Sequence, residues 1–176
     1  MKNYVLVVDV NKDKGGSMIN EFKDQNRFLS NFYILENPIK IGILEFDSNE
    51  HFYQAHKTID LVDRTWISGI ETPGNARKAG SKKGLGGRKI QLREDWKKEE
   101  VKRVVMYTGL TMKFMGNYNI ASKLIATNNK ELIEGNWWHD NYWGDCKCDK
   151  CRHIVGENNL GKLLMLTRDM LTLIRI

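Results

Sequence analysis

SNEHFYQAHK, residues 48–57, is the stretch that decides the architecture of this chain. It separates Glu50, Gln54 and Lys57 by four and then three residues, which places their side chains on one face of an α-helix. An acid, an amide and a cation together suit the wall of a polar pocket. The same residues also fit an exposed helix that is capped at residue 47 or 48, with Glu50 completing a capping box. The stretch alone leaves both interpretations open.

The composition predicts one soluble domain. Hydrophobic residues make up 41% and charged residues 28% of the 176 residues, which is usual for a globular protein long enough to bury a core. No apolar run reaches membrane-spanning length, so we expect no membrane partner. Residues 1–10 have too short an apolar core and no small-residue cleavage site for a secretion signal. We therefore expect a cytoplasmic protein.

The net charge of +6 favours anionic partners such as nucleotides or nucleic acid. Residues 77–93 hold a cluster of basic side chains interleaved with glycines, and these are Arg77, Lys78, Lys82, Lys83, Arg88, Lys89 and Arg93. Such a segment can bind phosphate through cations and backbone N–H groups, or it can be a solvated loop.

The pattern along the chain predicts an α+β fold that is mainly α-helical, with a few short peripheral strands. Strands are expected over residues 4–10, 17–22 and 40–46. Helices are expected over 49–61, around Trp66 and Ile67, from Thr72-Pro73 to Gly80, and over 95–115, 119–127 and 158–175. Residues 136–145 form a loop so rich in tryptophan that its aromatic side chains should be buried or line a pocket.

An ordered set of motifs resembles the NADAR superfamily, also called YbiA-like, from about residue 19 to residue 172. The motifs are LSNF (29–32), EHFYQAxK (50–57), PxxAxxxG (73–80), DW (95–96), MKF (112–114), WGD (143–145) and NxLGxLLMxxR (158–168). The resemblance implies a compact single-domain YbiA-like fold over residues 19–176. Residues 1–18 would then be an N-terminal extension with a short strand, and residues 146–153 a cysteine-rich insert.

The resemblance also implies an enzyme, a hydrolase that cleaves the bond between ribose C1 and a base nitrogen. We expect removal of ADP-ribose from guanine in nucleic acid or nucleotides, because the chain is basic. The alternative within the family is hydrolysis of a ribosylaminopyrimidine phosphate intermediate of riboflavin synthesis. The alternative from another class is a non-catalytic nucleotide or nucleic-acid binding module.

The family motifs carry expected roles to particular residues. Glu50 and Asp145 match the acidic positions and are expected to be catalytic, since two carboxylates can stabilise a sugar cation and transfer protons. The expected substrate-binding residues are Asn31, Lys57, Trp96, Trp143 and Asn158. Structural alternatives exist: Trp96 in the core, Asp145 capping a turn and Asn158 capping the last helix.

The three cysteines lie together as Cys146-x-Cys148-x-x-Cys151. In a cytosolic chain this spacing favours metal over disulfides, and zinc prefers four ligands. His153 is the expected fourth ligand, with His139 as the alternative, and reduced thiols without metal are the other interpretation. Any zinc would be structural, and no cofactor is expected in catalysis.

Overall fold

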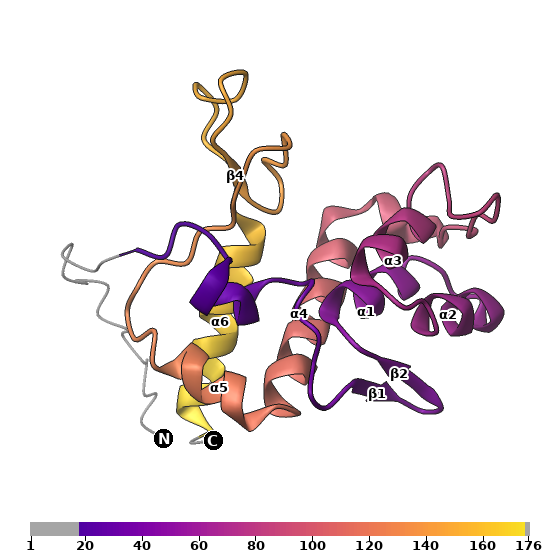
Figure 1. Cartoon of the computed structure of the whole chain (residues 1–176), viewed down its shortest axis with the longest axis horizontal. Helices are drawn as coiled ribbons and strands as arrows, with labels where there is room; N and C mark the ends of the chain where they lie inside the picture. The colour runs from indigo at the N-terminus through magenta and orange to yellow at the C-terminus, as the bar shows by residue number, and fades with distance from the viewer. Residues whose placement is uncertain (1–17, 175–176) are drawn as a thin grey trace, which may run out of the picture.

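A computed structural model describes residues 18–174 of the chain (Figure 1). The elements in order are η1 (Asp24–Leu29), β1 (Ile39–Ile41), β2 (Leu44–Phe46), α1 (Asn49–Ala55), α2 (Leu61–Ser68), α3 (Pro73–Ala79), η2 (Glu94–Lys97), α4 (Glu99–Met115), α5 (Tyr118–Ile125), β3 (Gly135–Asn136), β4 (Asp145–Cys146) and α6 (Asn159–Leu173). The expected mainly helical α+β fold is confirmed. The expected strand over residues 4–10 lies outside the described residues.

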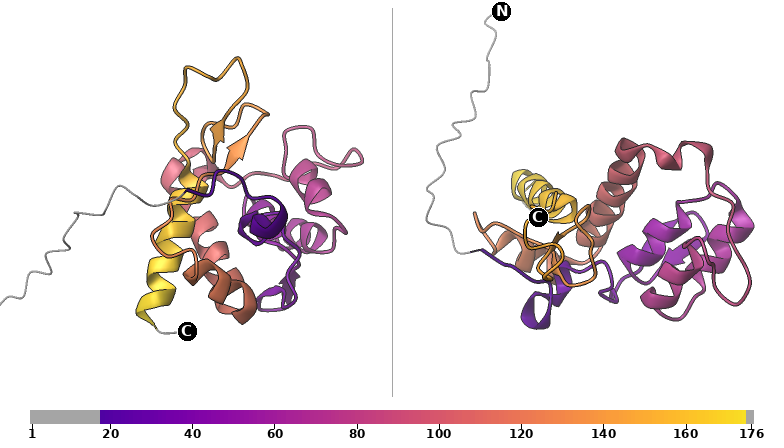
Figure 2. Two further views of the ribbon diagram at one scale, coloured as in Figure 1. Left: turned by 60° about the vertical axis from the view of Figure 1, so that its left-hand side comes forward. Right: turned by 90° about the horizontal axis from the view of Figure 1, so that it is seen from above.

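The long helix α4 runs through the middle of the fold. It packs against α5 and α6 on one side and against α1 on the other, where α2 and α3 also lie (Figures 1 and 2). Leu110 and Phe114 of α4 are fully buried between these groups, as are Leu124 and Leu164. Burial of each such side chain contributes about 1.5–3 kcal/mol. This core fixes α1, the helix that carries Glu50.

The signals at helix ends decide the boundaries of the short helices. Thr72 caps α3 by accepting the N–H of Asn75, Pro73 occupies the first turn, and Gly80 ends the helix, as predicted. The predicted single helix over 49–61 is wrong, because α1 ends at Ala55. A new helix, α2, starts after Asp60, whose carboxylate accepts the N–H of Asp63.

The strands are shorter than predicted. Residues 39–46 form an antiparallel hairpin that turns at Gly42, which adopts a φ of +58°. In residues 18–22, the described part of the predicted strand 17–22, only Ile19 makes a bridge, to Leu132. The two-residue strands β3 and β4 pair in parallel.

The chain between β3 and the start of α6 forms two loops that project from the body beside the first turn of α6 (Figure 2). Trp137 in this segment is 57% exposed and lines none of the cavities described below, so the expectation that every tryptophan here is sheltered is wrong. Within residues 18–174, no helix combines the length and the apolar character needed to cross a membrane.

Candidate active site

A cavity of about 270 Å³, the central pocket, lies where α1 faces the loops that precede η2 and α6. Its walls come from segments far apart in the sequence. They are Ser30, Asn31, Phe32, Glu50, Tyr53, Gln54, Lys57, Arg77, Ser81, Met106, Glu134, Trp138, Asp140, Trp143 and Leu160. Acidic, cationic and aromatic side chains thus meet in one place.

Glu50 is the most deeply buried acid of this pocket, with 6% of its surface exposed. Its backbone N–H donates to the carbonyl of Asn31 (2.9 Å), and the Nε2 of Gln54 donates to its Oε1 (2.7 Å). Burial raises the pKa of Glu50 above its usual value, while the hydrogen bond from Gln54 and the charge of Lys57 act in the opposite direction. The helix therefore holds a carboxylate that is poorly solvated and oriented by its neighbour four residues on.

The amide of Gln54 can lie beside Glu50 in this conformation only because residue 80 has no side chain. A Cβ on Gly80 would lie 2.0 Å from the Oε1 of Gln54. That oxygen is buried and has no hydrogen-bond partner within residues 18–174. Gly80, at the end of α3, therefore packs closely against the amide of Gln54, which donates to Glu50.

His51, the neighbour of Glu50, has a structural role. Its ring lies between the hydroxyl of Ser48 (2.8 Å) and the carbonyl of Ile70 (2.8 Å), and the side chain is fully buried. Burial lowers its pKa, which favours a neutral imidazole that accepts from Ser48 and donates to Ile70. His51 therefore anchors α1 and lines no part of the central pocket.

Asn31 lines the pocket and also joins its walls. Its Oδ1 accepts from the Nδ2 of Asn49 (2.8 Å), and its own Nδ2 approaches the sulfur of Met106 (3.4 Å) on α4. Because the carbonyl of Asn31 binds the N–H of Glu50, this residue sets the loop against the start of α1.

Lys57 lies at the border between the central pocket and a second cavity of about 380 Å³, the basic pocket. Its Nζ donates to the carbonyl of Gly80 (3.1 Å) and lies 5.5 Å from the ring centre of Tyr53. Burial lowers the pKa of Lys57 to about 8, partly offset by the charge of Glu50. The basic pocket is also lined by Lys82, Lys89, Lys97 and Lys102.

The two expected tryptophans lie in different places. Trp143 lines the central pocket and meets the ring of Tyr53 edge-on at 5.5 Å. Trp96 is buried on the other side of Tyr53 (5.3 Å between ring centres) and lines the basic pocket. Of these two tryptophans, only Trp143 lines the pocket that holds Glu50.

Asp145 does not line the central pocket. Its carboxylate binds the ammonium group of Lys147 and accepts the N–H of Gly156 (3.0 Å), and the pairing with Lys147 lowers its pKa. The geometry thus separates Asp145 from Glu50, contrary to the expected catalytic pair. The glycine of the WGD motif is required by packing, because a Cβ on Gly144 would lie 2.1 Å from the carbonyl oxygen of Glu134.

Asn158 is also kept away from the central pocket by its own hydrogen bonds. Its Oδ1 accepts the N–H of Glu134 (3.0 Å), and its Nδ2 donates to the carbonyl of Leu132 (2.8 Å). The residue adopts a φ of +51°, a conformation that asparagine tolerates better than most residues. Its side chain positions the backbone of Glu134.

Two further acids line the central pocket, Glu134 and Asp140. Burial raises the pKa of Glu134 to about 7, and the charge of Asp140 adds to that shift and to the shift of Glu50. One carboxylate oxygen of Glu134 is buried without a hydrogen-bond partner among the described residues. Asp140 orients the loop, since its Oδ1 accepts the N–H of Trp143 (2.8 Å).

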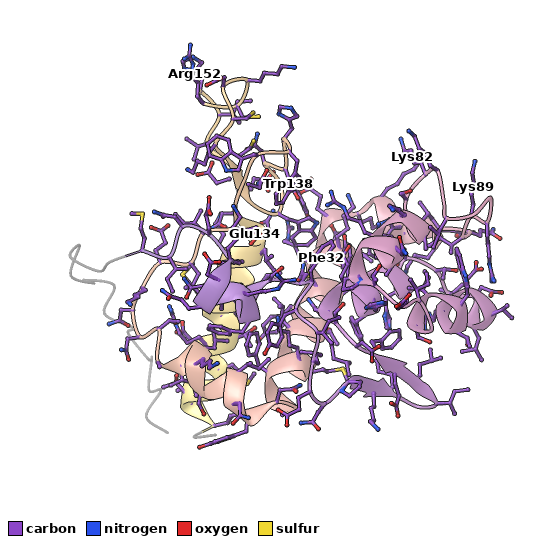
Figure 3. All side chains as sticks on the ribbon, in the orientation of Figure 1. Phe32, Lys82, Lys89, Glu134, Trp138 and Arg152 are labelled. Atoms are coloured by element: carbon purple, nitrogen blue, oxygen red, sulfur yellow. The ribbon has the colours of Figure 1, made fainter. Side chains whose placement is uncertain are left out.

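A third cavity of about 480 Å³, the outer pocket, shares Phe32, Arg77, Glu134 and Trp138 with the central pocket. It adds Phe22, Lys23, Asp24 and Arg27. Figure 3 shows Trp138 reaching from the projecting loops toward Phe32, with Glu134 on the same side of the body. The basic pocket therefore adjoins the central pocket on one side, and the outer pocket, with Lys23, Arg27 and Arg77 beside Asp24 and Glu134, adjoins it on another.

The projecting loops bring His139, Cys146, Cys148 and Cys151 together, and this set is here called the metal-binding group. Their ligand atoms all lie within 4.8 Å of one another, so the group could hold a metal ion. The expected ligand His153 is not a member. Its Nε2 accepts from the Nε of Arg152 (3.1 Å), and His139 takes its place.

The NADAR domain family model matches residues 19–172. The chain belongs to the NADAR family. Over 136 residues it is 34% identical to the N-glycosidase YbiA of Escherichia coli, covering 77% of each chain. It is 31% identical over 153 residues to a riboflavin biosynthesis protein of Vibrio vulnificus, covering 84% of this chain and 36% of that protein.

The fold of this chain matches a solved structure from the same family. The solution structure of E. coli YbiA superposes with a TM-score of 0.74 at 29% sequence identity, over 95% of this chain and 92% of that chain. The NADAR match spans α1 and the projecting loops alike. The central pocket is thus built from segments that lie inside the family domain.

Proposed function

We propose that this NADAR protein hydrolyses the bond between C1 of a ribose and a base nitrogen, and that its preferred substrate is ADP-ribosylated guanine in nucleic acid or nucleotides. The observation that carries the proposal is the buried carboxylate of Glu50 in a pocket that also holds Glu134, Asp140 and Trp143. The relative in E. coli is named an N-glycosidase, which is the same reaction class.

The chemistry follows from the charge that develops on the sugar. As the C1–N bond breaks, C1 becomes cationic, and an ionised Glu50 beside it stabilises that charge. Water then adds to C1 and gives a proton to a carboxylate. Each such electrostatic contact contributes a few kcal/mol, of order ~3, in a closed site.

The departing base needs a proton, and Glu134 is the side chain suited to supply it. A carboxyl group with a pKa of about 7 is partly protonated at neutral pH, so it can act as a general acid. The charge of Asp140 raises the pKa of Glu50 and of Glu134, so it favours the protonated form of a carboxyl group in the pocket. We propose Glu50 and Glu134 as the acid–base pair in place of Glu50 and Asp145.

The basic pocket, together with Arg27 and Arg77 of the outer pocket, favours a substrate with more than one phosphate. The basic pocket holds Lys82 and Lys89 from the glycine-rich segment and meets the central pocket at Lys57. The outer pocket holds Arg27 and Arg77 on another side, together with Lys23, which pairs with Glu21, and the acids Asp24 and Glu134. An ADP-ribosyl group on a nucleotide presents a diphosphate together with a nucleotide phosphate, whereas a ribosylaminopyrimidine phosphate presents one phosphate group.

Aromatic side chains provide surfaces for the bases. Stacking of a base on an aromatic ring contributes about 1–3 kcal/mol. Trp143 lines the central pocket, and Trp138 and Phe32 line both the central and the outer pocket. We propose that Trp143 binds the base or ribose at the cleaved bond.

No cofactor is needed for these steps, because carboxylates supply the acid, the base and the charge. The metal-binding group contributes no side chain to the central pocket. We therefore assign a zinc ion in that group a structural role, in agreement with its closed set of four ligands.

The second candidate is hydrolysis of a ribosylaminopyrimidine phosphate. It is favoured by the names of two relatives, the riboflavin biosynthesis proteins of Vibrio vulnificus and of Zea mays. The maize protein is 32% identical over 127 residues, covering 68% of this chain and 19% of that protein.

The deciding experiment offers the purified protein both substrates separately, an oligonucleotide carrying ADP-ribosylated guanine and the ribosylaminopyrimidine phosphate. We expect release of ADP-ribose from the first to exceed release of ribose phosphate from the second. Faster cleavage of the second substrate would replace the proposed specificity. Binding without cleavage of either would point to a binding module instead of a hydrolase.

A further inference from the structure

The metal-binding group has the dimensions of a tetrahedral zinc site. The Nδ1 of His139 lies 3.2 Å from the Sγ of Cys148 and 3.4 Å from the Sγ of Cys151. Zinc with three thiolates and one imidazole separates its ligand atoms by about 3.5–3.8 Å, given bonds of about 2.0–2.3 Å. To accept the ion, the imidazole and these two thiols move apart by a few tenths of an ångström, and the ligand atoms separated by up to 4.8 Å move together by about 1 Å.

Hydrophobic packing does not account for the shape of these loops. The thiols of Cys146 and Cys151 are buried at their centre, while the apolar side chains of Trp137, Ile154 and Val155 are exposed. A loop with ligands inside and apolar residues outside lacks the driving force that normally orders a chain. Metal ligation supplies that force, as in small zinc-stabilised domains.

The backbone is shaped to deliver the histidine. His139 adopts a φ of +67°, a left-handed conformation that a residue with a Cβ adopts at a cost. Its N–H points to the sulfur of Cys146 (3.3 Å). A backbone conformation of this kind persists when surrounding contacts hold it in place, and binding of the His139 imidazole to a metal ion would be such a contact.

The metal-binding group is joined directly to the wall of the central pocket. His139 lies between Trp138 and Asp140, and both neighbours line that pocket. Trp138 is 51% exposed, so packing against the body fixes it only in part. The carbonyl of Asp140 accepts a hydrogen bond from the Nδ2 of Asn136 (2.7 Å). Asn136 lies in the short strand β3, which pairs with β4.

We propose that the metal-binding group holds one zinc ion, and that this ion fixes Trp138 and Asp140 in the pocket wall so that substrate affinity depends on the metal. The ion binds three thiolates and one imidazole, which leaves no open position for water. Its action is therefore one of positioning. The link to affinity rests on the proposed function, whereas the binding of zinc does not.

The first test measures zinc per chain in protein purified without added metal. We expect about one equivalent in the wild type and at least about tenfold weaker zinc binding in His139→Asn and Cys148→Ser. Asparagine tolerates the left-handed conformation of residue 139, so the backbone is disturbed little. His153→Asn, which changes a histidine of the same loops outside the group, is the matched control and keeps its zinc.

A second readout needs no substrate. The loops carry exposed tryptic sites at Lys147, Lys150 and Arg152. Chelation, or the His139→Asn change, should speed cleavage there by at least about tenfold if the metal orders the segment, and added zinc should restore protection of the chelated wild type. Equal cleavage rates with and without zinc, or a wild type that contains no zinc, would overturn the metal site.

The third test concerns the pocket. In His139→Asn, the KM for the ADP-ribosylated oligonucleotide should rise about tenfold, as expected from the loss of one stacked ring, with kcat within about threefold of wild type. An unchanged KM in a variant that has lost its zinc would overturn the link to the pocket. If the wild type cleaves no N-glycosyl substrate, the proposed function fails, while the zinc and trypsin results still decide the metal site.

Discussion

Replacement of Gly80 by alanine should disturb catalysis without any change at a residue that lines the central pocket. Gly80 has a φ of −81°, which alanine adopts freely, so the perturbation is purely steric. The new Cβ would lie 2.0 Å from the Oε1 and 2.9 Å from the Cδ of Gln54. The amide must rotate away, and its hydrogen bond to Glu50 is lost.

The size of the effect follows from that hydrogen bond. A hydrogen bond to a charged group contributes about 1.5–3 kcal/mol. The bond from Gln54 favours the ionised form of Glu50 and lowers its pKa, so its loss raises the pKa of Glu50. Only the part of this energy that is specific to the charged form contributes to the rise, because the oxygen of a neutral carboxyl group also accepts a hydrogen bond.

The assay is the pH dependence of kcat/KM for release of ADP-ribose. If ionised Glu50 is the catalytic form, the acidic limb of the profile moves to higher pH in Gly80→Ala. Gly69→Ala is the matched control: Gly69 ends α2 at a φ of −85°, and a Cβ there would lie 3.7 Å from its nearest neighbour. An acidic limb at the same pH in both variants would refute the role assigned to Glu50.

Three further outcomes follow from the buried charges. Glu50→Gln should melt at a higher temperature than wild type at pH 8, because burial raises the pKa of Glu50 and its ionisation therefore opposes folding; a lower melting temperature would instead mark Glu50 as structural. Because burial raises the pKa of Glu134, the free energy of unfolding decreases by up to about 3 kcal/mol as the pH rises from 4.5 to about 7. Because burial lowers the pKa of Lys113, the free energy of unfolding increases as the pH rises from about 7 toward 10.5. Denaturant titrations should thus find a stability minimum near pH 7, and Lys113→Met should show a smaller alkaline rise, the remainder coming from Lys57, whose pKa is lowered to about 8; a stability maximum near pH 7 would contradict both assignments. Asp145→Asn should keep kcat within about threefold of wild type, whereas loss of a proton-transfer group costs about 100-fold or more.

Local sequence signals predicted the parts of the site that lie on helices. The spacing of Glu50 and Gln54 placed them on one face of α1, and Lys57 lies in the turn that follows the helix; all three line the central pocket. Thr72-Pro73 and Gly80 fixed α3, and the position of Gly80 in turn sets that of Gln54. These features depend on contacts between residues close in sequence, which periodicity and capping report.

The parts of the site that lie on loops could not be predicted in the same way. Asp145 and Asp140 are five residues apart in one aromatic segment, and only the path of the backbone decides which one faces Glu50. Glu134 reaches the pocket because the side chain of Asn158 holds its backbone from 24 residues away. His139, not His153, joins the cysteines because its left-handed φ turns the chain toward them.

Single-turnover release of ADP-ribose from an oligonucleotide carrying ADP-ribosylated guanine, compared between the wild type and Glu50→Gln, tests the central claim most directly. The amide keeps the shape of the side chain and removes its charge. We predict cleavage by the wild type and a loss of at least about 1,000-fold in the variant, with affinity for the oligonucleotide within about tenfold of wild type. Cleavage by Glu50→Gln at the wild-type rate would contradict the account.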